Sequence, residues 1–154
     1  MPDKPKILGR KEWVALPDLG LPAIKAKVDT GARTSALHAD DIQPVGSPEQ
    51  PSVRFTVHPL PLRPDIAVVC TARVLAEREV TSSNGERERR YIIETRLRVG
   101  DREWPIEVGL TNRGSMSHRM LLGRQGIPPD FMVDPSGTYH QPKLGARSYK
   151  ASTR

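Results

Sequence analysis

Along most of this chain, apolar side chains recur at every second position, and this pattern constrains the fold more than any other feature. Residues 21–28 and 91–99 are clear examples of the alternation. It is typical of half-buried β-strands, whereas helices need apolar residues three and four positions apart. The 15 prolines and 12 glycines are scattered through the 154 residues, which disfavours long helices. The sequence therefore predicts an all-β protein whose short strands pair or close.

The interruptions of the alternation predict how the chain is organised. We expect one domain over residues 1–140 and a basic, flexible tail over 141–154. Residues 118–126 carry an apolar cluster that predicts one short helix near the C-terminus. Strands are expected at residues 7–16, 21–28, 34–39, 41–43, 53–58, 66–74, 91–99, 103–110 and 131–134, and loops at 44–51 and 59–64.

The strand expected at residues 21–28 ends in Asp29-Thr30-Gly31-Ala32. A turn at this point presents the Asp29 carboxylate, and Gly31 lets the backbone approach a substrate because it has no Cβ. Two carboxylates about 3 Å apart share one proton, so one can act as a base toward water while the other polarises a carbonyl group. Because the chain has only one such turn, this chemistry requires a homodimer that supplies Asp29 twice.

Val28 to Ala32, followed later in the chain by Met120-Leu121-Leu122-Gly123-Arg124-Gln125, resembles the retropepsin-like aspartic peptidases. The longer run from Lys25 to Ala39 resembles a bacterial branch of that fold that is often named ATP-dependent zinc protease. Members of that branch resemble the peptidase partner of glutamate-adding ATP-grasp ligases in ribosomal-modification systems. The resemblance covers residues 7–134 and implies a retropepsin-like (acid protease) closed barrel half.

The resemblance also implies a reaction and roles for individual residues. Asp29, Thr30 and Gly31 are implied to be catalytic, with Thr30 bonding across the dimer axis and Gly123 and Arg124 supporting the turn. The implied reaction is hydrolysis of a peptide or amide bond by activated water, without a covalent intermediate. The implied substrate is an acidic, glutamate-rich tail, as on a glutamylated ribosomal protein, and an ATP-grasp glutamate ligase is an implied partner.

One departure from the family pattern concerns substrate binding. Many retropepsins follow the alanine with acidic residues that pair with the later arginine and bind the substrate backbone. Here Arg33-Thr34-Ser35 follows Ala32, so Arg124 lacks its usual acidic partner. We expect Ala32, Arg33 and Arg124 to contact the substrate, and the cations at this point favour an acidic one.

Asn84-Gly85, within the polar residues 77–90, predicts a hairpin at the place where retropepsins carry a flap. We expect the arginines around its tip, together with Arg33, to bind substrate carboxylates in bidentate fashion. The alternative is a solvated, charged strand edge, because glutamates are interleaved with these arginines. The flap arginines are Arg78, Arg87, Arg89 and Arg90.

The sequence gives no reason to expect a cofactor, a metal site or a membrane segment. It has no His-Glu-x-x-His, no cysteine pair and no Walker-type glycine-rich loop. His38 and His58 could still meet in space with Cys70 or Asp40. The lone cysteine excludes an intrachain disulfide and fits a reducing cytoplasm, and no apolar run follows residues 1–6 as a signal peptide would require.

Two other interpretations remain open. The net charge of +6 fits an acidic partner, so the chain could be a non-catalytic binding module for ribosomal protein or RNA, with salt-sensitive binding. Alternatively, the two copies of Asp29 could be too far apart in the resting assembly, and a partner or substrate would then complete the site.

Overall fold

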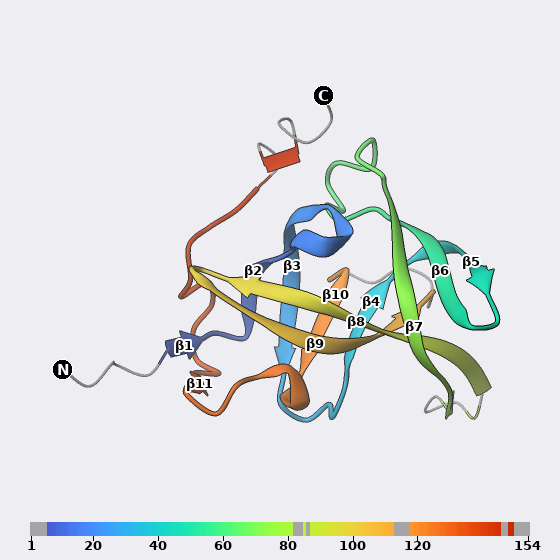
Figure 1. Ribbon diagram of the computed structural model, residues 1–154. Coiled ribbons are helices and arrows are strands. Elements are labelled where there is room, and N and C mark those ends of the chain that lie inside the picture. Colours follow the sequence, from blue (N-terminus) through green and yellow to red (C-terminus); the bar gives the residue numbers. More distant parts are fainter. Residues whose placement is uncertain (1–5, 82–84, 86, 113–117, 146–147, 150–154) are drawn as a thin grey trace.

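The computed structural model describes residues 6–81, 85, 87–112, 118–145 and 148–149, and it confirms the all-β prediction (Figure 1). The two short helical elements η1 (Pro17–Leu19) and η2 (Arg124–Gly126) are single 3₁₀ turns. No helix in the described part of the chain is long and apolar enough to cross a membrane. The strands are β1 (Lys6–Leu8), β2 (Lys11–Leu16), β3 (Leu21–Asp29), β4 (Ser35–His38), β5 (Asp40–Ser47), β6 (Gln50–Val57), β7 (Val68–Thr81), β8 (Arg87–Val99), β9 (Arg102–Thr111), β10 (Met120–Gly123) and β11 (Phe131–Val133).

Six strands close into a barrel in the order β2-β3-β10-β4-β9-β8, as the prediction of a closed barrel half required. Ala15 of β2 pairs with Arg98 of β8 and completes the ring. The sheet continues from β8 through β7 and β6 to β5, which lie to one side of the barrel in Figure 1. β1 and β11 form a separate parallel pair.

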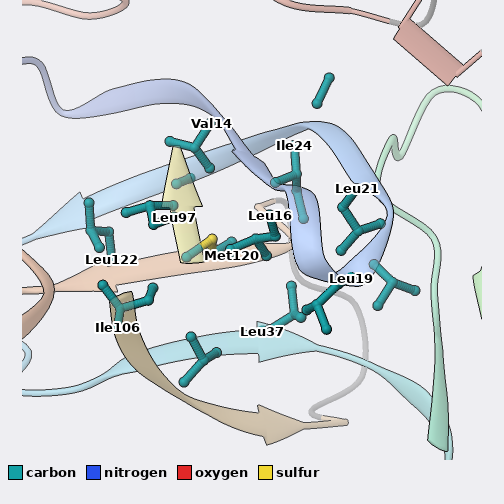
Figure 2. Close-up of a cluster of buried hydrophobic side chains, with 14 of the residues drawn as sticks. Val14, Leu16, Leu19, Leu21, Ile24, Leu37, Leu97, Ile106, Met120 and Leu122 are labelled. Carbon is teal, nitrogen blue, oxygen red and sulfur yellow. The ribbon is translucent and has the colours of Figure 1, made fainter. Parts of the chain in front are cut away.

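Apolar side chains at alternate strand positions fill the barrel, and Figure 2 shows residues of β2, β3, β4, β8 and β10 converging there. Burying one such side chain contributes about 1.5–3 kcal/mol, so the alternation seen in the sequence is the main source of stability. The labelled residues that are fully buried are Val14, Leu16, Leu21, Ile24, Leu37, Leu97, Met120 and Leu122.

The loop predicted over residues 44–51 is wrong, because most of it belongs to the β5–β6 hairpin. Its prolines suggested a loop, since proline has no N–H to donate to a sheet. Pro44 is tolerated because β5 is an edge strand, and Pro51 precedes the segment of β6 that pairs with β7. The position of each proline in the sheet therefore decides whether it is compatible with a strand.

The helix predicted over residues 118–126 is confined to η2. Met120 to Gly123 instead form β10, which lies between β3 and β4 and pairs with both. The apolar cluster that suggested a helix is therefore a strand whose alternate residues, Met120 and Leu122, are buried in the barrel. Sequence-local patterns cannot reveal this pairing, because its partners lie about ninety residues away.

The buried Glu12 carboxylate connects the two ends of the described chain. Its Oε2 accepts hydrogen bonds from the Gly9 N–H at 2.7 Å and the His140 N–H at 2.9 Å, and its Oε1 accepts one from the Gln141 N–H at 3.1 Å. The Tyr149 hydroxyl donates to the Ala23 carbonyl oxygen. Parts of the segment expected as a tail thus contact the barrel, while the division at residue 140 stays a prediction.

β10 passes directly beneath the loop that joins β3 to β4. Gly123 pairs with Asp29, and a Cβ atom on Gly123 would lie 2.4 Å from the Thr34 carbonyl oxygen. The Gly123 N–H donates to the Ser35 hydroxyl at 3.0 Å, and Ser35 is itself buried. This crossing fixes the position of the Asp29 turn relative to the barrel.

We expect Gly123→Ala to lower the free energy of unfolding by about 1–3 kcal/mol, because the added methyl group overlaps backbone atoms that cannot rotate away. The Gly123 φ of −82° suits alanine, so the effect is steric rather than conformational. Urea unfolding followed by circular dichroism measures it. Gly145→Ala is the matched control, since nothing lies within 4 Å of that Cβ position. Equal midpoints for the two variants would contradict the tight crossing.

Candidate active site

The strand β3 ends by presenting the Asp29 carboxylate in a tight turn. Asp29 is half-buried, while Thr30 and Gly31 are exposed. The Gly31 N–H donates to Asp29 Oδ1 at 3.0 Å, and the Ala32 N–H donates to the Asp29 carbonyl oxygen at 3.1 Å. The turn therefore holds the Asp29 side chain in a fixed direction at the protein surface.

The residues after β10 hold the far side of the turn through backbone hydrogen bonds. The Arg124 N–H donates to the Ala32 carbonyl oxygen at 2.9 Å, and the Gln125 N–H donates to the Arg33 carbonyl oxygen at 3.1 Å. Together with the Ser35 hydroxyl beneath Gly123, these bonds connect the loop to the rigid barrel at three successive positions. Such support limits movement of the Asp29 carboxylate.

The Arg124 side chain also acts on the turn. Its Nη1 lies 3.4 Å from the Thr30 carbonyl oxygen and 3.3 Å from the Gly31 carbonyl oxygen, and it donates to both. No ion pair between Arg124 and a carboxylate occurs in the described part of the chain. The guanidinium instead binds the two carbonyl groups of the turn, those of Thr30 and Gly31. Contact between Arg124 and a substrate stays a prediction.

The structure brings five of the predicted site residues together in the turn, namely Asp29, Thr30, Gly31, Ala32 and Arg124. The flap arginines lie instead on the long β7–β8 hairpin, where Arg78 is opposite Arg90 and Glu79 is opposite Arg89. Side chains alternate across a strand, so Arg78 and Arg90 share one face while Arg87 and Arg89 share the other. Asn84, at the predicted hairpin turn, lies outside the described residues.

Carboxylates of the same chain neutralise three of the four flap arginines. Arg33 and Arg89 have no carboxylate within 4.0 Å among the described residues. These ion pairs are in part what a solvated, charged strand edge would show, which is the alternative to substrate binding by the flap arginines. The three pairs are Arg78 with Glu107 at 3.6 Å, Arg87 with Glu79 at 3.5 Å and Arg90 with Glu88 at 3.3 Å.

His38 and His58 do lie close together, on either side of Asp40, with Nε2–Oδ distances of 3.8 and 3.7 Å. Burial lowers the pKa of His38, against the raising effect of Asp40. Within the residues that the structure describes, no group of three histidine, cysteine or carboxylate side chains is arranged to hold a metal ion. Cys70 is buried elsewhere, and burial raises the pKa of its thiol to about 12, which makes it a poor nucleophile.

Ser35 is a site residue whose role the sequence did not reveal. It sits at an inward position of β4, in the same alternation as the buried Leu37. A hydroxyl at an otherwise apolar inward position was the available signal, because a buried polar group requires a hydrogen-bond partner. Here that partner is the Gly123 N–H.

Comparisons with known proteins match this chain to a family. A family profile described as RimB-like, retropepsin-like aspartic endopeptidase RimB, matches residues 7–144. Proteins named probable alpha-L-glutamate ligase are 45% identical over 139 residues in Shewanella pealeana and 46% identical over 133 residues in Parasynechococcus marenigrum. The matches cover 90% and 86% of this chain, but only 30% and 28% of those relatives.

A solved structure has the same architecture. The crystal structure of Lpg0085, a protein of unknown function (DUF785) from Legionella pneumophila, superimposes with a TM-score of 0.72 at 29% identity. The superposition covers 88% of this chain and 97% of that one. The profile match, the relatives and the fold agree over nearly the whole chain, and the chain belongs to the RimB-like family of retropepsin-like aspartic endopeptidases.

Proposed function

We propose that this chain is an aspartic-type peptidase, active as a homodimer, that hydrolyses peptide or amide bonds in acidic, glutamate-rich tails such as those of a glutamylated ribosomal protein. The observation that carries the proposal is the Asp29 turn. Its carboxylate accepts the Gly31 N–H at 3.0 Å, and the Arg124 guanidinium holds the carbonyl groups behind it. The family membership supports the same reaction type.

The proposed mechanism needs two carboxylates that share one proton. The ionised carboxylate takes a proton from water, and the water oxygen bonds to the carbonyl carbon. The protonated carboxylate gives its proton to the carbonyl oxygen, which forms a neutral tetrahedral diol. Breakdown of the diol transfers a proton to the nitrogen as the C–N bond breaks, so the products are a carboxylic acid and an amine.

A homodimer supplies the second carboxylate most simply. The chain has one Asp-Thr-Gly turn, and Thr30 is exposed beside Asp29, where it can bond to a second copy of the same turn. A two-fold axis brings identical residues together, as isologous dimers do. We therefore place Thr30 at the dimer axis and the two copies of Asp29 on either side of it.

The proposed substrate class rests on charge and on the names of the relatives. The chain carries a net charge of +6, which attracts acidic chains. The relatives that match it are named as glutamate ligases and are much longer than this chain. An ATP-grasp ligase that adds glutamates is therefore the proposed partner, with this chain acting on the product.

The high net charge equally favours the second candidate, a binding module for RNA or ribosomal protein.

We expect Asp29→Asn to lower kcat/KM on a peptide ending in several glutamates by about 10²–10⁴-fold, because the dyad loses its shared proton and its base. Mass spectrometry of the products measures glutamate loss. Asp101→Asn is the matched control, because this substitution removes the same charge and the Asp101 side chain is 85% exposed. Cleavage by both Asp29→Asn and wild type would remove Asp29 from the mechanism. Cleavage by neither, with folded dimers, would favour the binding module.

Mixing the two proteins tests the shared site. If each active site needs Asp29 from both subunits, wild type and Asp29→Asn co-refolded from urea in equal amounts retain about a quarter of the wild-type activity per total protein. If each Asp29 acts alone, about half remains. The comparison is made at constant total protein, and light scattering establishes that the mixture is dimeric. A value near one half would rule out the two-carboxylate site.

The proposed flap contact also gives a test. We expect Arg89→Glu to raise KM for an acidic peptide at low ionic strength, because Arg89 has no carboxylate partner in the described chain and repulsion replaces attraction. Arg87→Glu provides the comparison, since Arg87 is already paired with Glu79. Unchanged KM for Arg89→Glu at low salt, where screening is weak, would argue that the flap arginines form only a solvated edge.

A further inference from the structure

Three lysines lie together on the outer face of β2 and β3, in a row that ends at Asp29. Lys25, Lys27 and Asp29 occupy alternate positions of β3, and the residues between them are buried, so all three project outward. Lys11 is directly opposite Lys27 across the β2–β3 pair. Alternate residues of a strand are about 7 Å apart, so this lysine row (Lys11, Lys25 and Lys27) approaches Asp29 in steps of that length.

Two aromatic rings hold the far end of the row in place. The Lys25 Nζ lies 5.3 Å from the ring centroid of Trp13, which is its cross-strand neighbour, and 5.9 Å from that of Tyr139. A cation over a ring face is attracted by the ring quadrupole. The Lys25 ammonium is therefore positioned before any ligand binds, which reduces the entropy that a ligand must overcome.

The pKa of His118 responds to the charges of all three lysines. Burial lowers its pKa first, and Lys11, Lys27 and Lys25 lower it further. The ring is accordingly held neutral near pH 7, so the positive charge of the patch comes from the lysines themselves.

The charge of the row is not balanced within the described residues. Like charges directly opposite each other, as Lys11 and Lys27 are, destabilise a sheet. In the described chain no carboxylate lies within 4.0 Å of a lysine of the row, although three flap arginines have such partners. The repulsion between Lys11 and Lys27 is therefore not offset by a carboxylate of the described chain.

We propose that the lysine row binds the carboxylates of an acidic peptide segment and holds it extended beside Asp29. The inference rests on the proposed function and assigns the place where the substrate's acid groups are held. Acidic side chains at alternate positions of an extended peptide are also about 7 Å apart, so two of them match the spacing of Lys25 and Lys27. Glutamates on one side of the scissile bond are then recognised by β3 itself.

The surroundings favour a peptide over a nucleic acid. The row ends at Asp29, whose charge repels phosphate, whereas a peptide can present an uncharged amide bond there. Binding of single-stranded nucleic acid also relies on exposed rings on which bases stack. Trp13 is only 7% exposed, and Lys25 lies over its ring.

Binding of fluorophore-labelled hexaglutamate, measured by anisotropy at low salt on the uncleaving Asp29→Asn background, tests the proposal directly. We expect Lys27→Gln to weaken binding about tenfold, because a charge-assisted contact is lost, and Lys27→Glu to weaken it further. Lys143→Glu is the matched control, since Lys143 is exposed, outside the row and undergoes the same change of charge. Equal affinities for Lys27→Glu and Lys143→Glu overturn the proposal.

A second readout separates recognition from a structural effect. In the otherwise wild-type chain, we expect Lys27→Gln to lower kcat/KM on an acidic peptide while leaving its glutamine-for-glutamate analogue unchanged. An equal loss on both peptides overturns the proposal, as does a dimer that dissociates in Lys27→Glu with hexaglutamate binding intact. Binding of an RNA oligomer through Lys27 in preference to hexaglutamate also overturns it. If wild type cleaves nothing, the anisotropy experiment still decides the role of the row, so the two failures are distinguishable.

Discussion

The close passage of Gly123 beneath Thr34 is the constraint on which the rest of the site depends. Only a residue without a Cβ atom fits at position 123, because that atom would lie 2.4 Å from the Thr34 carbonyl oxygen. The passage places the Gly123 N–H on the Ser35 hydroxyl and the Arg124 N–H on the Ala32 carbonyl oxygen. The Asp29 carboxylate is therefore positioned by the barrel core, through a strand that belongs to both the core and the site.

Much of this arrangement could be predicted from the sequence, because its local causes are visible there. The period-two alternation predicts the β class. The resemblance to the retropepsin-like peptidases, carried by Asp29-Thr30-Gly31 and Leu122-Gly123-Arg124, implies that these two segments meet, as they do. The errors arose where partners distant in sequence decide the structure. The prolines of residues 44–51 predict a loop, but the edge position of β5 allows a strand there. The apolar cluster of residues 118–126 predicts a helix, but Met120 to Gly123 form β10 between β3 and β4.

Charge shows the same limit more clearly. Clustering along the chain drew attention to the flap arginines, yet strand alternation divides them between two faces and carboxylates neutralise three of them. The lysines at positions 11, 25 and 27 are inconspicuous in the sequence, but pairing of β2 with β3 brings them together. The pairing register of the strands thus determines which charges lie together, and the clustering of charges along the sequence does not.

The buried Glu12 carboxylate has a consequence for how the protein is made. One of its hydrogen-bond donors, Gly9, is synthesised at almost the same time as Glu12. The other two, His140 and Gln141, lie 128 and 129 residues later in the chain. A carboxylate buried without those donors is costly, so β2 cannot reach its final environment until residues 140 and 141 have been synthesised. Folding of the barrel therefore waits for a segment that lies far along the chain from β2, and a chain that stops before residue 140 leaves the Glu12 side chain without two of its three hydrogen-bond donors.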